Sequence, residues 1–175
     1  MPQGSGTGPW GYSKYTEPLG LLLCIIRLFY HMFADDTQLH VSVNPNSLPD
    51  QLNAKSKIEH CLQDVAQWMT ENRLKLNKGK TEFMILGTKT QISKLQFSSL
   101  NVCGDEIKTN TCIRNLGVWM DPELKMCHHV KHIQKVCYRN IRELRSIRQY
   151  LTSDAIKTLV QAMVISHLDY SNSLL

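Results

Sequence analysis

Two adjacent acids, Asp35 and Asp36, are the residues of this chain best suited to chemistry. They follow the apolar run 21–33 (LLLCIIRLFYHMF) and precede 37–43 (TQLHVSV), in which apolar and polar side chains alternate. The pattern predicts a strand, a tight turn and a second strand. Because two ionised carboxylates side by side repel each other, a divalent cation usually holds them, and the pair indicates a Mg²⁺ site for phosphate chemistry. The same pair also suits a plain hairpin turn, since Asp tolerates turn geometry.

Other short motifs accompany this pair in a fixed order. Phe33-Ala34-Asp35-Asp36 resembles the polymerase hairpin of reverse transcriptases, and the following Thr37-Gln38-Leu39 is the form found in LINE-type (non-LTR) retrotransposons. The remaining blocks that resemble the family are Pro2-Gln3-Gly4-Ser5, Trp68-Met69 with Leu74-Lys75-Leu76-Asn77 and Lys80-Thr81-Glu82, Asn115-Leu116-Gly117-Val118 with Asp121-Pro122, and Leu168-Asp169-Tyr170. Each motif alone is weak. Together, and in order, they identify the chain as a member of that family over essentially its whole length.

The resemblance assigns roles to single residues. It makes Asp35 a metal ligand and Asp36 the supporting carboxylate of a site for two Mg²⁺ ions, which would serve the primer 3′-hydroxyl and the leaving pyrophosphate. Lys80 would lie near the triphosphate as a general acid, the alternative being a solvated turn lysine. Gln3 and Gly4 match the block that passes close to the nucleotide. For the chain alone we favour a flexible tail at that position.

The resemblance also divides the chain into a partial palm, residues 1–121, and a helical thumb, residues 122–175. The fold class is therefore α+β, with an antiparallel palm sheet, one packing helix and the thumb. A basic stripe on the first thumb helix could follow the phosphates of a template–primer duplex, although a basic helix face is more often merely solvated. The stripe consists of Lys131, Lys135, Arg139, Arg142 and Arg145.

The family holds its catalytic metals with three carboxylates, one of them in a block upstream of Pro-Gln-Gly-Ser. Because this sequence starts at Met1, we expect that block and the fingers to be absent, and the fragment to be cut at both ends and inactive alone. The implied activity is RNA-directed DNA polymerisation, with an RNA template, a DNA primer and deoxynucleoside triphosphates as partners. A non-catalytic nucleic-acid-binding module and a functionless remnant of a mobile element stay open as alternatives.

Composition agrees with an intracellular nucleic-acid partner, in the nucleus or the cytoplasm. The 175 residues carry a net charge of +5 and are 42% hydrophobic, enough to bury a core. The six cysteines form no CxxC pair and are expected to be free thiols, with no disulfide-linked partner. No signal peptide or membrane span is visible. Cys127, His128, His129 and His132 lack a clear fourth ligand, so zinc is not expected.

Hydrophobic periodicity and turn residues predict the remaining elements. The predicted helices cover Tyr12 to about Leu23, residues 50–72, about Pro122 to Tyr150, and a last helix that is capped by Thr152-Ser153-Asp154 and runs to about His167. The predicted strands cover residues 81–86, a hairpin around Gly104-Asp105, and Ile113 to Met120 with a bend or bulge at Gly117.

Overall fold

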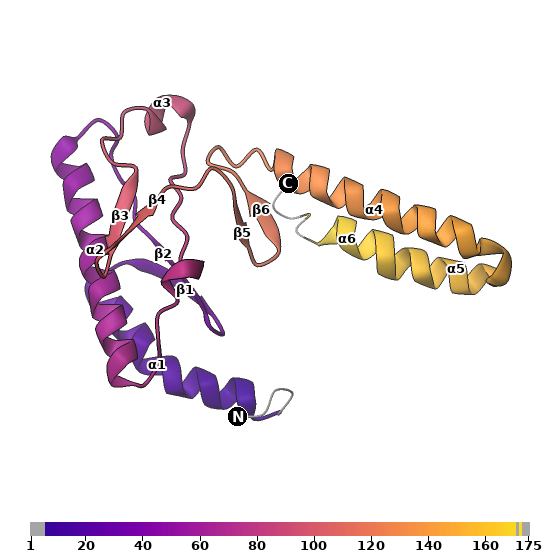
Figure 1. The fold of residues 1–175 in the computed structure, drawn as a ribbon, viewed down its shortest axis with the longest axis horizontal. Coiled ribbons are helices and arrows are strands. Elements are labelled where there is room, and N and C mark those ends of the chain that lie inside the picture. Colours follow the sequence, from indigo (N-terminus) through magenta and orange to yellow (C-terminus); the bar gives the residue numbers. More distant parts are fainter. Residues whose placement is uncertain (1–5, 171, 173–175) are drawn as a thin grey trace. The chain divides into compact units, whose positions relative to one another are not determined.

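The computed structural model describes residues 6–170 and 172, in which helices and antiparallel strand pairs follow one another (Figure 1). The expected α+β class is confirmed. Three separate two-stranded hairpins, in the part of the chain that is described, take the place of one continuous sheet. The chain divides into two compact units, one of residues 1–83 and 90–109 and the other of residues 84–89 and 110–175. None of the described helices combines the length and apolar character needed to cross a bilayer.

The core of the first unit lies between two helices. α1 (Gly8–Ile26) starts with a proline in its first turn, and α2 (Leu48–Glu71) starts at Ser47, whose hydroxyl accepts the backbone N–H of Asp50. Leu19, Leu23 and Leu28 pack there against Cys61 and Val65 of α2. Prediction of both helices is confirmed within a few residues at each end.

The hairpin of β1 (Phe29–Phe33) and β2 (Asp36–His40) covers this core with one face. Tyr30, Met32 and Leu39 point to the core, whereas Phe29 and Phe33 stay exposed. The predicted hairpin is confirmed, but the apolar run does not begin as a strand. Residues 21–26 complete α1, and Arg27 ends the helix in the left-handed conformation before the strand begins.

A second hairpin, β3 (Ser99–Val102) and β4 (Asp105–Lys108), lies against α2, where Glu59 accepts the backbone N–H of Asn101 at 2.7 Å. It confirms the hairpin predicted around Gly104. The predicted strand 81–86 is wrong: Phe83 makes a single bridge to Thr109, and its neighbours lie in irregular backbone. No partner strand is paired along that segment, so its apolar side chains pack without a ladder.

The segment from Lys78 to Lys80 forms a short 3₁₀ turn, η1, and Lys89–Ile92 forms the one-turn helix α3. The buried Gln51 of α2 fixes the loops nearby. Its amide nitrogen donates to the carbonyls of Pro45 and Lys94, and its oxygen accepts the N–H of Gln96 at 2.9 Å. Every polar atom of this buried side chain therefore has a partner, as burial requires.

The second unit starts with a hairpin rather than the predicted single strand. β5 (Ile113–Asn115) turns back into β6 (Val118–Met120) through Leu116 and Gly117. Both turn residues have positive φ, 46° and 86°, and the second is a conformation that glycine adopts at little cost. The glycine therefore marks a reversal of the chain, not a bulge.

The first long helix of this unit, α4, spans Cys127–Ile147 and continues as the 3₁₀ turn η2 (Arg148–Tyr150). It begins five residues later than predicted, because Leu124 and Met126 have positive φ and cannot continue a helix. Thr152 caps α5 (Ser153–Val160) as predicted, by accepting the N–H of Ala155. The π-helical turn η3 (Gln161–Ile165) and α6 (Ser166–Asp169) complete an antiparallel partner for α4 (Figure 1).

Two polar side chains occupy the buried face of α4, whereas the apolar side chains spaced by three or four residues along this helix include Val130 and Ile141. Asn140 donates to the carbonyl of Met163 at 2.6 Å, within the π-helical turn. His129 is 2% exposed, and its Nδ1 accepts the backbone N–H of Trp119 at 3.5 Å. The buried face is rotated accordingly, and Val130 and Ile141 are about half exposed.

His129 gives the fold a pH dependence with a definite sign. Burial, and then the neighbouring His132, lower the pKa of His129 below its ordinary value. The unfolded chain therefore binds the proton more tightly, so this contribution to stability is complete above about pH 6.5 and is lost as pH falls below it. We expect the thermal midpoint to fall more steeply from about pH 7.5 to about pH 5.5 in the natural chain than in His129→Gln.

The exposed neighbour His128 supplies the control, since His128→Gln should keep the steep slope. Equal slopes for the natural chain and His129→Gln, measured by circular dichroism, would contradict this account.

Candidate catalytic hairpin and nucleic-acid interface

The two acids lie at the tip of the β1–β2 hairpin, as the sequence predicted. Ala34, with φ 52°, and Asp35 form the two-residue turn, and Asp36 is the first residue of β2 and pairs with Phe33. Both carboxylates are exposed. Because Asp36 is opposite Phe33 in the register, its side chain belongs to the exposed face of the hairpin, whereas Asp35 extends from the turn itself.

Helix α1 comes close to this tip. The pKa of Tyr12 is raised, first by burial and second by the negative charge of Asp35. The early turns of α1 therefore lie within electrostatic reach of the acid predicted to be the ligand. Gln3 and Gly4, the predicted nucleotide-binding residues, precede this helix and lie outside the described residues.

The donor atoms at the tip suit a hard cation. Mg²⁺ prefers carboxylate oxygens, and a protein usually supplies one or two carboxylates while water or substrate phosphates complete the octahedron. Asp35 and Asp36 offer that kind and number of oxygen donors. Within residues 6–170 and 172, no group of three or more His, Cys, Asp or Glu side chains lies close enough to hold a metal ion. The hairpin therefore fits part of a Mg²⁺ site.

The neighbouring lysine Lys78 has a structural role. Its ammonium group pairs with Asp105 at 2.7 Å and donates to the carbonyl of Cys103 at 2.9 Å, which ties η1 to the β3–β4 turn. Lys80, the predicted general acid, follows at the end of η1 with an exposed side chain. Among the described residues no ion pair engages Lys80, so its ammonium group can approach an anion.

The predicted basic stripe lies on the solvent side of α4. At about 100° per residue its five members fall opposite the buried side chains of that helix, and all five are exposed. Arg139 approaches Glu143 at 4.0 Å, a contact typical of a weak surface pair. The other four cations have no ion-pair partner in the described part of the chain. They are Lys131, Lys135, Arg142 and Arg145.

One residue of this face was not predicted from the sequence. Tyr138 is 62% exposed and lies in the middle of the stripe, seven residues after Lys131, four before Arg142 and seven before Arg145. These spacings place it in line with the cations. The helical spacing alone could have identified it, had the aromatic residues been compared with the basic stripe as well as with the apolar one.

Comparison with known proteins gives one family. The family model described as "Reverse transcriptase (RNA-dependent DNA polymerase)" matches residues 1–120. Neither the curated proteins nor the solved structures contain a significant match. The matched residues include the whole acidic hairpin, η1 and the β5–β6 hairpin. The chain therefore belongs to the reverse transcriptase family.

Proposed function

We propose that this chain is part of a LINE-type (non-LTR) reverse transcriptase that copies RNA into DNA. The observation that carries the proposal is the pair Asp35-Asp36 at the tip of an antiparallel hairpin, within a chain whose residues 1–120 match the family. Thr37-Gln38-Leu39 after the acids supports the LINE type. On this proposal residues 1–121 correspond to a partial palm, residues 122–175 to the thumb, and the protein acts inside the cell, in the nucleus or cytoplasm.

In this proposal the hairpin positions the two carboxylates that take part in nucleotidyl transfer. Asp35 is the metal ligand, and Asp36 supports it from the first position of β2. Bound Mg²⁺ would supply Lewis acidity toward the primer 3′-hydroxyl and the triphosphate. Lys80 donates a proton to the leaving pyrophosphate, for which its exposed ammonium group, without an ion pair to any described residue, is suited. Gln3 and Gly4 hold the incoming nucleotide.

In this proposal the thumb binds nucleic acid without regard to its sequence. The stripe on α4 supplies four cations that form no ion pair with any residue the structure describes, and cations of this kind bind backbone phosphates. Tyr138 adds an exposed aromatic ring among them, on which a base or sugar at the end of a duplex can stack. RNA template and DNA primer are the partners that fit. This surface also favours the second candidate function, binding without catalysis.

We further propose that the 175 residues alone do not polymerise. The family uses three carboxylates, and the hairpin provides two exposed ones. Two carboxylates leave more of the Mg²⁺ shell to water, so metal affinity and positioning of the 3′-hydroxyl both suffer.

Primer extension tests this proposal on an RNA template with a DNA primer, deoxynucleoside triphosphates and Mg²⁺. The chain alone should give no product above background, and Asp35→Asn should be indistinguishable from it. Extension by the natural chain that Asp35→Asn abolishes would overturn the proposed inactivity, while placing catalysis at the predicted acid.

Metal binding at the hairpin can be tested apart from turnover. Mn²⁺ should broaden the amide NMR signals of Ala34 and Asp35, and Asp35→Asn should remove most of that broadening because the variant lacks a hard-cation ligand. Asp105→Asn is the matched control, since Asp105 is also an exposed acid beside a hairpin turn. If that variant loses broadening at the β1–β2 tip as strongly, the effect is non-specific and the assignment of Asp35 fails.

The nucleic-acid interface predicts a particular salt dependence. Replacing Arg139 and Arg142 together by Gln should weaken duplex binding and reduce the slope of log K against log salt by roughly 2, because each arginine that neutralises a phosphate accounts for about one unit of slope. Fluorescence anisotropy with a labelled RNA–DNA hybrid measures both. Lys14→Gln with Lys157→Gln, at exposed lysines already paired with acids, removes the same charge elsewhere.

Equal slopes for the two double variants would mean that α4 is only a solvated face. Tyr138 is tested in the same assay. Tyr138→Leu should weaken binding several-fold with an unchanged salt slope, and Tyr138→Phe should restore it, because stacking needs the ring and not the hydroxyl.

A further inference from the structure

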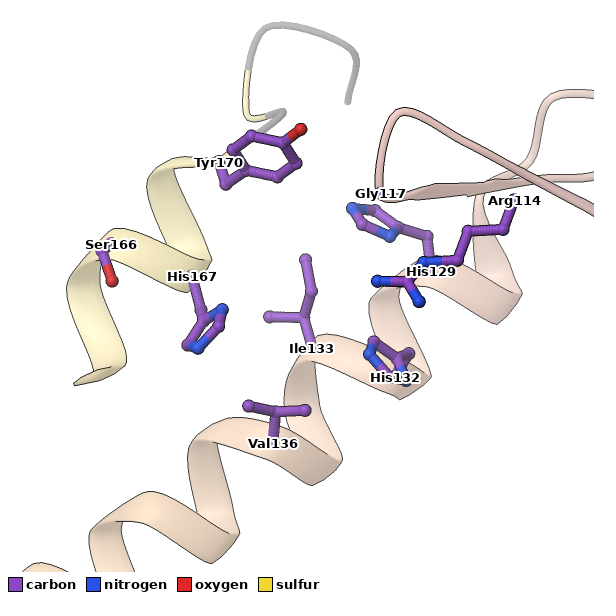
Figure 2. A pocket seen from close by; sticks show the side chains of 9 residues that line it. All are labelled: Arg114, Gly117, His129, His132, Ile133, Val136, Ser166, His167 and Tyr170. Atoms are coloured by element: carbon purple, nitrogen blue, oxygen red, sulfur yellow. The ribbon is translucent and has the colours of Figure 1, made fainter. Parts of the chain in front are cut away.

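An open cavity in the second unit lies between the β5–β6 hairpin, α4 and α6 (Figure 2). Its volume is about 360 Å³. Arg114 of β5 and His167 of α6 line it from two sides, and α4 contributes His129 and His132. Ile133 and Val136 of α4 supply the apolar part of the wall. None of these side chains belongs to the acidic hairpin or to the basic stripe.

The lining groups share one electrostatic character. Arg114, His132 and His167 line the cavity from three elements, and in Figure 2 Ile133 lies between the His167 ring and the Arg114 guanidinium. No Asp or Glu side chain is among the lining residues of this cavity. The guanidinium lies over the Trp119 ring, 5.9 Å from its centroid, and no ion pair neutralises it within the described residues. Among the described residues, this permanent cation therefore lines the cavity without a counter-ion.

Besides the Arg114 guanidinium, the histidines supply hydrogen-bond donors to the cavity. The pKa of His129 is lowered by burial and by His132, and its Nδ1 accepts the N–H of Trp119, so the neutral ring carries its hydrogen on Nε2. His132 and His167 also line the cavity, where a ring N–H of each can donate to an anion. The remaining titratable group that lines the cavity is Tyr170, whose hydroxyl donates to the carbonyl of Leu116 at 2.5 Å.

Three histidines around one space also suggest a metal, but Arg114 argues against it. A fixed cation beside the rings repels a metal ion, whereas it strengthens hydrogen bonds to an anion. In the described part of the chain no three potential ligands are grouped for a metal. Guanidinium and imidazole donors around an acid-free space are the groups that recognise phosphate.

We propose that this cavity binds a phosphate group, held by Arg114, His132 and His167. The cavity volume exceeds that of a phosphate ion, and the apolar wall of Ile133 and Val136 leaves room for an organic group attached to it. The site does not depend on polymerase activity, because no residue of the acidic hairpin or of the basic stripe contributes to it.

The test is a titration of the whole chain with inorganic phosphate, followed by NMR of the histidine rings at one fixed pH. We expect the His132 and His167 signals to shift as phosphate is added. Arg114→Gln should weaken binding roughly tenfold, as the loss of one charge facing the anion can do. His167→Gln, which removes a ring donor and leaves Trp119 untouched, should also weaken it.

Matched controls come from the same unit. Arg148→Gln and His128→Gln remove an exposed arginine and an exposed histidine that neither line the cavity nor belong to the basic stripe, and both should leave phosphate affinity unchanged. Since Arg114 also stacks on Trp119, circular dichroism must show that Arg114→Gln folds, and His167→Gln decides the result if it does not. Binding that is equally strong in both cavity variants, or equally weakened by both controls, would overturn the proposal.

A second experiment decides whether the phosphate group belongs to a nucleic-acid end or to a small molecule. An oligonucleotide with a terminal phosphate is compared with the same oligonucleotide ending in a hydroxyl. A preference for the phosphorylated strand that His167→Gln removes assigns the cavity to a nucleic-acid end, whereas binding of inorganic phosphate alone assigns it to a small phosphate ligand. The phosphate site would be disproved if neither ligand bound in a way that depends on Arg114 and His167. This conclusion would hold whatever the outcome of the duplex-binding assay.

Discussion

Burial of only one face of the β1–β2 hairpin fixes where the two acids point. Tyr30, Met32 and Leu39 must stay on the core of α1 and α2, and the strand period of two then sends the alternate positions to solvent. A slip by one residue would bury Asp36 and expose the apolar set, so the register is strongly specified. The ionised pair is thus kept in water at the tip by apolar contacts several residues away, at no cost of burying charge.

The sequence was most informative where one local signal and one packing requirement agreed. The α2 helix combines a Ser47 cap with an apolar stripe that reaches Cys61 and Val65, and its predicted limits are close to those observed. The segment 81–86 shows the reverse case. Its apolar residues fit a strand, but a strand exists only if another strand pairs with it, and that partner is a matter of tertiary structure.

Positive φ values explain the two other errors. Leu124 and Met126 take the left-handed conformation, and the start of α4 moves to Cys127 although Pro122 and the nearby acids suit a helix start. The residue types do not predict these positive φ values, because leucine and methionine rarely adopt the left-handed conformation. At Gly117 the sequence did signal a special backbone position, but a bulge and a two-residue turn both use glycine, and only the pairing of β5 with β6 separates them.

The residues of the candidate site also fall into two groups, those that local sequence signals predict and those that depend on distant partners. The positions of the first group could be predicted from local signals: Asp35 and Asp36 from the turn between two apolar runs, and the α4 cations from their helical spacing. The polar residues that sequence reasoning missed are buried ones whose partners are backbone groups of distant segments. His129 meets the N–H of Trp119, and Asn140 meets the carbonyl of Met163. An apolar pattern cannot include such residues, since burial favours them only once the partner is in place.

The two faces of α4 consequently respond to different variables. The outer face carries arginine and lysine, which stay charged throughout the physiological range, so dissolved salt is the variable that acts on it. The inner face carries the buried His129, whose lowered pKa makes stability depend on pH, and it borders a cavity that is also lined by one guanidinium. On the two binding proposals, one helix would contact an extended anion on its outer side and a small anion on its inner side. Dissolved salt therefore acts on the outer face, whereas pH acts on the packing of the inner face.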